Sequence, residues 1–312
     1  MKIIYNTQDD YQDVPHSYYD LYRFNDDSTQ EIFFYGYNCS INEELKRQYK
    51  SYSRKIYYNW ETPCSFYCRE DAVTSQLYFD EVYTLCPYTA EYINNKYGDI
   101  TKQIAVPYTI RVEKFIEFVS DFNNKEYDVM YQGQFNSEDH MTMLSSMQKH
   151  KYAICSIGPN QAITHRGLTT HQKMDLISRS KISLASNQLY LTKQQIEYCK
   201  HHYPNYKDNR AFLYLDTGTV PQFKSRVMEA AFCKSLNLVK YDYWNVIEEW
   251  FKPDEDFVYY YNNVDLSEKI EHILANYNDY IPLINSAYKK VLSYDIDDQM
   301  RRIINKQKMY NE

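Results

Sequence analysis

Short apolar runs alternate with amphipathic segments along most of the chain. In the first third, runs rich in β-branched and aromatic residues predict strands at 2–6, 31–37, 55–60, 81–86 and 102–108. Segments 41–52 and 88–98 between them have a helical pattern, and the second ends at Gly98, a residue typical of helix ends. This alternation predicts a parallel sheet covered by helices on both faces.

The polar segment 122–128 separates this series from a second one of the same kind. Further strands are predicted at 127–133, 151–158, 181–186, 211–216, 236–242 and 257–261, and helices at 137–150, 170–180, 225–235 and 265–278. Segment 188–208 looks like an insertion with one helix. Asp265 is expected to cap the helix that it begins, with Glu268 completing the capping pattern.

The fold class predicted from this pattern is α/β, with two Rossmann-like domains facing a cleft. The domains are expected at 1–120 and 121–290, and a helical segment at 291–312. In open α/β sheets ligands bind at the carboxyl ends of the strands, so the cleft is the expected place for a site.

Composition narrows the class of protein. With 44% hydrophobic and 25% charged residues, the 312-residue chain can build a sizeable packed core. Its net charge of −7 disfavours a broad basic face for duplex nucleic acid. Seven scattered cysteines predict reduced thiols and a cytoplasmic protein, in a bacterial or a virus-infected host cell. No apolar run is long enough to span a bilayer, so membrane insertion is not expected.

The stretch from Lys224 to Val239, KSRVMEAAFCKSLNLV, carries the strongest chemical signal. Ser225 is expected to cap a helix, which puts Lys224 and Arg226 at its N-terminus, where the helix dipole opposes positive charge. A bound phosphate resolves this conflict, because free N–H groups, the dipole and both cations would then meet an anion. Glu229 lies one turn on, where it could accept hydrogen bonds from ribose. The alternative is a surface ion pair between Arg226 and Glu229.

Gly133 ends the strand predicted at 127–133, and the next residue is Gln134. A glycine here would let a ligand approach the backbone closely, although a simple turn is the alternative. The chain has neither the G-x-G-x-x-G pattern of dinucleotide-binding folds nor a Walker sequence.

The helix at Arg226, the strand after it, the sequence WFKPDEDFVYYYNNVDL and the earlier runs YDVMYQG and LISRSKISLAS together resemble a known family. They look like the C-terminal donor domain of GT-B glycosyltransferases, in particular the CgeB-like and family-one-like groups, over about 125–295. The resemblance implies that Arg226 and Lys224 bind a diphosphate, that Glu229 binds the ribose, and that Gly133 lines the phosphate cleft. The donor-binding candidates are Gly133, Gln134, Lys224, Ser225, Arg226 and Glu229. Many retaining members have a second glutamate where this chain has Pro221.

Residues for the acceptor side are expected at the ends of the N-terminal strands. Asp10 and Glu61 are the candidates for a general base, with Asp9 and His16 as alternatives. Arg226 completes the catalytic set by stabilising the leaving diphosphate.

A metal site is not expected. Cys64 and Cys68 have no second pair at zinc spacing, and the two D-x-D strings, at 254–256 and 295–297, are interpreted as structural. No essential cofactor is expected beyond the nucleotide-diphosphate sugar as donor substrate.

The sequence thus predicts a glycosyltransferase, hexosyl or pentosyl, acting on a glycan or another hydroxyl acceptor. Two alternatives stay open: a phage or virus enzyme that glycosylates hydroxymethylated bases of DNA, and a non-catalytic module that binds a nucleotide sugar.

Overall fold

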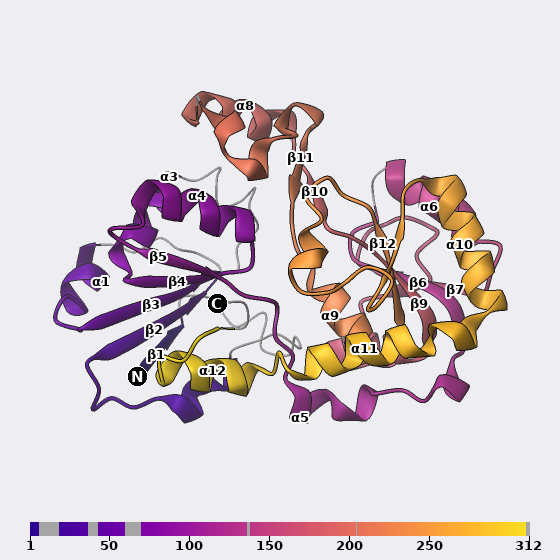
Figure 1. Cartoon of the computed structure of the whole chain (residues 1–312), viewed down its shortest axis with the longest axis horizontal. Helices are drawn as coiled ribbons and strands as arrows, with labels where there is room; N and C mark the ends of the chain where they lie inside the picture. Colours follow the sequence, from indigo (N-terminus) through magenta and orange to yellow (C-terminus); the bar gives the residue numbers. More distant parts are fainter. Residues whose placement is uncertain (6–18, 37–42, 60–69, 136–137, 204, 310–312) are drawn as a thin grey trace.

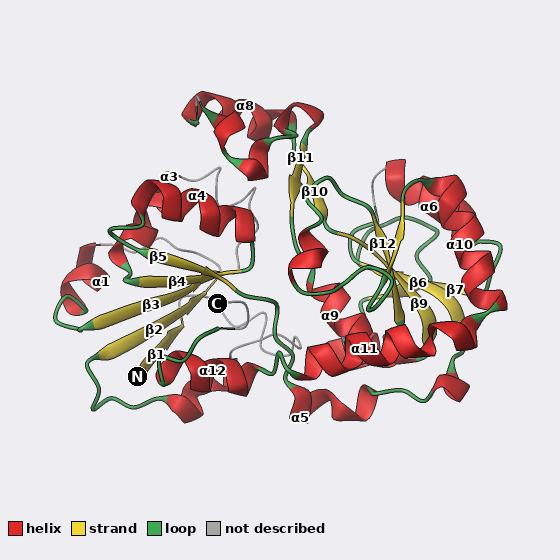
Figure 2. Ribbon diagram, in the orientation of Figure 1, coloured by secondary structure: helices red, strands yellow, loops and turns green. Residues whose placement is uncertain are grey.

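The computed structural model describes residues 1–5, 19–36, 43–59, 70–135, 138–203 and 205–309. These residues form two parallel sheets side by side, each with helices packed on its faces (Figures 1 and 2). The α/β class predicted from the alternating pattern is therefore confirmed.

The N-terminal sheet has five parallel strands in the order in which they occur along the chain. They are β1 (Lys2–Tyr5), β2 (Glu31–Gly36), β3 (Arg54–Asn59), β4 (Glu81–Thr84) and β5 (Lys102–Ala105). Each strand overlaps a predicted one. The apolar runs are not interrupted by polar residues at every second position because both faces of the sheet are buried.

The helices that connect the strands from β2 to β5 lie on one face of the sheet, as right-handed crossovers between sequential parallel strands require. These helices are α1 (Glu43–Gln48), α3 (Glu70–Ser75) and α4 (Pro87–Tyr97). The opposite face is covered by η1 (Tyr19–Phe24) and by α12 (Ile296–Ile304) from the far end of the chain. Ile296, Met300 and Ile303 are buried there against the strands.

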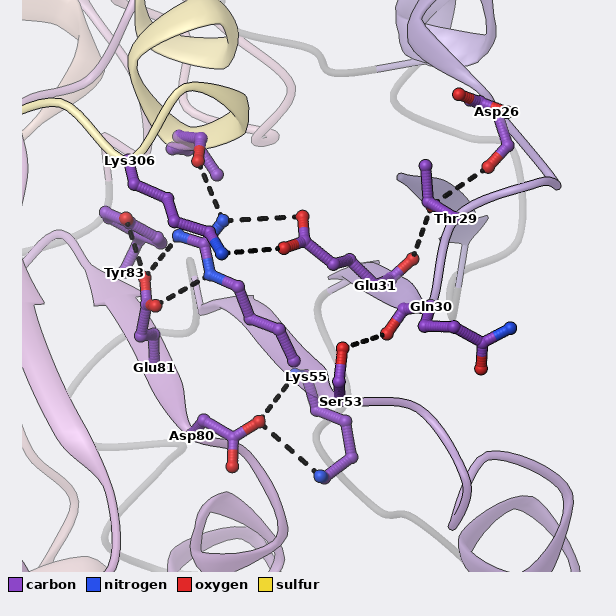
Figure 3. Close-up of polar contacts among 12 residues, drawn as sticks. Asp26, Thr29, Gln30, Glu31, Ser53, Lys55, Asp80, Glu81, Tyr83 and Lys306 are labelled. Atoms are coloured by element: carbon purple, nitrogen blue, oxygen red, sulfur yellow. Dashed lines mark hydrogen bonds and ion pairs between the residues drawn. The ribbon is translucent and has the colours of Figure 1, made fainter.

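A polar cluster at the amino ends of β2, β3 and β4 fastens α12 to the sheet (Figure 3). Arg54 is 8% exposed and donates to both carboxylate oxygens of Glu81 at 2.8 Å, and to the carbonyl of Ile303 at 2.9 Å. Lys306, just after α12, forms an ion pair with Glu31 at 3.0 Å. Burial raises the pKa of Glu81, but the Arg54 guanidinium outweighs burial and leaves that pKa lowered.

The C-terminal sheet has six parallel strands in the order β13-β12-β9-β6-β7-β8. They are β6 (Tyr127–Gln132), β7 (Tyr152–Ser156), β8 (His165–Arg166), β9 (Ser180–Ser186), β12 (Leu236–Lys240) and β13 (Val258–Tyr260). The chain builds the sheet outward from β6 in one direction and from β9 in the other. The point where the order reverses therefore lies between β6 and β9, which is where such sheets bind ligands.

Helices cover both faces of this sheet. On one face α6 (Glu138–Met147) and α10 (Asn263–Ala275) pack on the strands. On the other face lie α7 (Thr170–Ser178), α9 (Ser225–Phe232) and α11 (Ile281–Leu292). This second core is continuous with the helical side of the N-terminal sheet, so the two halves share one apolar interior.

The insertion between β9 and α9 is correctly predicted to hold one helix, α8 (Lys193–His202). It is framed by an antiparallel pair, β10 (Gln188–Tyr190) and β11 (Thr219–Pro221). The strand predicted at 211–216 is wrong. The Asn209 side chain caps a 3₁₀ turn there, so that Phe212 and Leu215, spaced for a helical turn, both point into the core.

The remaining described elements are short: α5 (Val112–Phe115) and the 3₁₀ turns η2 (Gln76–Tyr78), η3 (Ile116–Phe118), η4 (Phe122–Asn124), η5 (Tyr206–Asp208), η6 (Arg210–Phe212), η7 (Leu215–Thr217), η8 (Val246–Glu249) and η9 (Tyr277–Tyr280).

Two predicted helix caps are wrong by one to three residues. Lys224, not Ser225, is the N-cap of α9, and Ser225 is its first helical residue. Asn262, not Asp265, caps α10, because its side chain already accepts from the N–H groups of Val264 and Asp265. Asp265 instead accepts from the N–H of Tyr261 at 2.8 Å.

The chain crosses between the two sheets twice, and the crossings lie side by side. Ile110 on the first crossing donates to Tyr294 at 3.1 Å and accepts from Ile296 at 3.2 Å on the second. In the described part of the chain, no helix combines the length and apolar character needed to cross a membrane.

Candidate functional site

A cavity of about 590 Å³ opens at the carboxyl ends of the C-terminal strands, on both sides of the point where the strand order reverses. Its walls come from segments far apart in sequence: Tyr131, Gln134, Asp139, His140, Met143, Ala185, Ser186, Gln188, Leu189, Tyr190, Lys224, Arg226, Lys240, Tyr260, Tyr261, Asn262 and Asn263. Its volume falls within the roughly 300–1,000 Å³ that is usual for small-molecule sites.

Arg226 projects from the first turn of α9 into this cavity. Its guanidinium lies 5.2 Å from the centre of the Tyr131 ring, and it forms no ion pair with any carboxylate that the structure describes. A partly buried cation without a counterion at a helix N-terminus favours binding of an anion.

Gly133 lies against this guanidinium, although it is not among the residues of the cavity wall. Its φ is +121°, and a Cβ added to it would lie 2.4 Å from Nη2 of Arg226. Its N–H donates to the carbonyl of Cys155 at 3.0 Å, which holds the backbone in place. The close approach of Arg226 to the backbone therefore needs a glycine at the end of β6.

Lys224 is the N-cap residue of α9 and lines the same cavity. Its N–H donates to Oδ1 of Asn187 at 3.0 Å, and its ammonium donates to the side chain of Gln222. These contacts hold the ammonium at the cavity wall, where it and Arg226 flank the helix N-terminus. Ser225 stands between them in sequence, but it is not among the residues of the cavity wall.

His140 and Tyr131 contact each other beside Arg226. The Tyr131 hydroxyl lies 2.8 Å from Nε2 of His140 and donates to the carbonyl of Gln134 at 3.0 Å. Burial, helped by the positive charge of Arg226, lowers the pKa of His140 to about 4. The imidazole is therefore neutral at physiological pH and can donate or accept a hydrogen bond without adding charge.

Asp139, Tyr190 and Lys240 meet at another wall of the cavity. Lys240 Nζ lies 2.8 Å from Asp139 and 3.5 Å from the hydroxyl of Tyr190, which also donates to Asp139. Burial raises the pKa of Asp139, but the bonds from Lys240 and Tyr190 outweigh it and leave that pKa lowered. This wall offers a carboxylate that stays ionised and a matched cation.

Glu229 is buried in α9, 1% exposed, and is not among the residues of the cavity wall. Lys173 of α7 forms an ion pair with its Oε1 at 2.8 Å. The ion pair that the structure gives Glu229 is therefore with Lys173 rather than with Arg226.

Asp10 and Glu61, the predicted acceptor-side bases, lie outside the described residues, as do Asp9, His16, Cys64 and Cys68. One aspartate of each D-x-D string has partners within the fold. Asp256 binds Lys290 at 2.5 Å and Ser286 at 2.6 Å, and Asp295 caps α12. No cluster of potential metal ligands occurs among the described residues.

Comparison with known proteins identifies the family. The profile of the family described as glycosyl transferase-like matches residues 140–305, more than half of the chain. The chain belongs to the glycosyl transferase-like family. No curated protein matches it.

Solved structures of glycosyltransferases share the fold of this glycosyl transferase-like chain. Sucrose-phosphate synthase from Thermosynechococcus elongatus superposes with a TM-score of 0.57 at 10% identity, over 89% of this chain and 73% of the other. Anabaena HepE, solved with UDP and glucose, gives a TM-score of 0.56 at 8% identity, over 88% of this chain and 77% of HepE. The pneumococcal O-GlcNAc transferase GtfA, solved with UDP and GlcNAc, gives a TM-score of 0.56 at 9% identity, over 89% of this chain and 56% of GtfA.

These likenesses establish the GT-B fold that the sequence resemblance implied. The chain spans about half of the length of GtfA and of TarM, so those proteins contain regions with no counterpart here.

The sequence did not predict several residues of the cavity wall. Lys240 ends β12, Ser186 ends β9, and Tyr261 and Asn262 follow β13. Their position at strand ends is a signal that could have selected them, because those ends meet at one edge of a parallel sheet. Tyr190 lies on the insertion, and no sequence pattern linked it to the site.

Proposed function

We propose that the protein transfers a sugar from a nucleotide-diphosphate sugar to a glycan or another hydroxyl acceptor. The observation that carries this proposal is the Arg226 guanidinium. It lies against Gly133 in the cavity and has no carboxylate partner in the described part of the chain. The glycosyl transferase-like family and the UDP-bound structures that share the fold support it.

In the proposed complex, Arg226 and Lys224 hold the diphosphate at the N-terminus of α9. Gly133, Gln134 and the N–H of Ser225 complete its surroundings. This placement follows from charge, since the cations and helix N-terminus all favour an anion.

Glu229 is the proposed ribose ligand. Because Lys173 now pairs with it and the side chain is buried, contact with ribose requires Glu229 to turn toward the cavity or the wall to move on binding.

The reaction breaks the bond between the sugar C1 and the diphosphate oxygen and forms a bond from C1 to the acceptor oxygen. Arg226 and Lys224 stabilise the negative charge that grows on the departing diphosphate. The acceptor proton passes to a general base, for which Asp10 and Glu61 remain the candidates, or to the departing phosphate.

The first test is Arg226→Ala, with release of UDP from UDP-sugars as the readout. We expect a loss of about 10²–10³ in turnover, as for removal of one charged stabilising group, in a protein that stays folded. Arg302→Ala is the control, because Arg302 pairs with Asp298 on α12, away from the cavity. Normal turnover by the Arg226 variant would refute the assignment of the phosphate site.

The same assays separate the alternatives. A module without catalytic activity would bind UDP in a thermal-shift experiment but release none from any UDP-sugar. If DNA is the acceptor, the protein should bind DNA with an affinity that falls steeply as the salt concentration rises. The net charge of −7 does not favour binding to DNA.

A further inference from the structure

A second cavity, of about 470 Å³, lies between α4 of the N-terminal half and the part of the insertion that begins at the end of α8. Figure 1 shows α8 above α4, on the side of the molecule where β10 and β11 rise from the C-terminal half. Neither the fold comparison nor the proposed reaction assigns a role to it.

Aromatic rings from both halves line this cavity. Tyr88 and Tyr92 come from α4, and Tyr203 and Tyr206 from the insertion. Tyr92 and Tyr203 meet edge to face at 6.3 Å across the junction. Burial raises the pKa of Tyr88 to about 12, so its hydroxyl is neutral. Tyrosine offers an apolar face together with a polar edge, which suits a ligand with both C–H and O–H surfaces.

Three amide side chains also line the wall: Asn95, Asn205 and Asn209. Asn209 is 2% exposed, and its Nδ2 has no hydrogen-bond partner among the described residues. A buried donor without a partner is costly, and a ligand hydroxyl is one group that could satisfy it.

The charges of the wall are balanced. Glu91 and Asp208 are matched by two cations, Lys96 and Arg210. Arg210 pairs with Glu91 at 2.8 Å and lies 4.9 Å from the Tyr88 ring centre. The wall has no excess of positive charge that would favour an anionic ligand. A neutral polyhydroxylated ligand does not require such an excess.

Hydrogen bonds within the C-terminal half and between the two halves hold the cavity together. Trp244 Nε1 donates to the Arg210 carbonyl at 2.8 Å, and the Tyr88 hydroxyl donates to the Trp244 carbonyl. The cavity is therefore built by the folded chain, which reduces the ordering cost of binding.

The insertion contributes residues to the walls of both cavities. Its first strand, β10, contributes Gln188, Leu189 and Tyr190 to the wall of the donor cavity, and the residues after α8 line the second. On the other side, α4 starts directly after the carboxyl end of β4.

We propose that this second cavity binds a neutral oligosaccharide, the part of an acceptor glycan remote from the hydroxyl that reacts. The inference rests on the proposed function for its link to transfer, but the binding itself can be tested alone.

The test uses the full chain on an array of neutral oligosaccharides with α- and β-linked hexoses, N-acetylhexosamines and pentoses. The strongest ligand is then titrated by calorimetry into the wild type and into the variants Tyr206→Ala and Asn95→Trp. Asn95 is exposed, so a tryptophan there can fill the cavity without disturbing the core. We expect about tenfold weaker binding or more in both variants. Tyr243→Ala is the matched control, since Tyr243 is 61% exposed and lines neither cavity.

UDP binding, measured by thermal shift on the same samples, shows that each variant is folded and tests the donor site separately. The inference is overturned if the array retains no neutral glycan, if it retains anionic glycans only, or if both cavity variants bind as the wild type does. Failure of the wild type to bind any of UDP, GDP, ADP and dTDP would instead refute the proposed function and leave the glycan result standing.

Discussion

At the scale of single residues, Gly133 shows how one backbone conformation shapes the donor cavity. Its φ of +121° lies in a region that other residues rarely adopt, and the Arg226 guanidinium occupies the space of its missing side chain. The absence of a Cβ at the end of β6 therefore sets the position of the proposed phosphate-binding cation.

Gly133→Ala should consequently disturb both folding and binding. We expect a loss of about 1–3 kcal/mol in the free energy of unfolding from backbone strain. We also expect UDP binding weaker by about tenfold or more, because Arg226 is displaced. Urea unfolding and calorimetry measure the two effects. Gly158→Ala is the control, since its added Cβ would meet no heavy atom closer than 3.7 Å; equal effects in both variants would contradict the account.

Asp242, which follows β12, is a second residue whose surroundings determine its chemistry. It is 1% exposed, and burial raises its pKa to about 6, although the N–H groups of Trp244 and Val246 oppose this shift. Because the folded-state pKa lies above the usual value, the folded protein binds this proton more tightly than the unfolded chain does. Ionising Asp242 therefore costs stability as the pH rises from about 4 to about 6, and the full cost persists above that range.

Asp242→Asn should therefore become more stable than the wild type as the pH rises. We expect little advantage near pH 4 and an advantage on the order of 2 kcal/mol at pH 8, from urea unfolding at several pH values. The exposed Asp99 gives the comparison, and Asp99→Asn should show no such trend. An advantage for Asp242→Asn that is constant with pH would show that burial does not perturb the Asp242 carboxyl.

At the scale of elements, the attachment of α12 to the N-terminal sheet depends on one buried arginine. Arg54 joins Glu81 on β4 to the last turn of α12 through the Ile303 carbonyl. The apolar face of α12 is buried beside it, so the polar contact fixes which end of the sheet the helix reaches.

Arg54→Met should leave Glu81 without its cation and lower the free energy of unfolding by about 3 kcal/mol. This value is near the lower limit for a broken buried pair, because Glu81 keeps partial access to solvent. Chemical unfolding measures this loss. Arg302→Met removes an i,i+4 pair on the surface of the same helix and should change stability by about 0.5 kcal/mol or less. Similar losses in the two variants would show that the cluster in Figure 3 does not fasten the helix.

The elements also show where pattern reasoning succeeds. Runs such as 31–37 and 127–133 were predicted as strands because a strand buried on both faces must be apolar throughout, and this signal is local. The strand predicted at 211–216 failed because an apolar run of that length also fits a buried 3₁₀ turn, and the Asn209 cap selected the turn.

At the scale of the whole molecule, the chain forms two parallel sheets and returns to the first through α12, so its two ends help to build the same half. The crossings at Ile110 and Ile296 run side by side, which restricts how the halves can move apart. The donor cavity lies in the C-terminal half, while the second cavity needs residues from both.

The sequence by itself determined the alternation of strands and helices, the α/β class and the cationic start of the helix at Arg226. Each of these depends on residues that are close together in the chain, where propensity, burial pattern and helix-end electrostatics act. Only the tertiary structure decided that Asp139, Tyr190 and Lys240 share a wall, and that Glu229 pairs with Lys173. These partners are separated by about 50 to 100 residues, and only the packing of the sheet, its helices and the insertion brings them together.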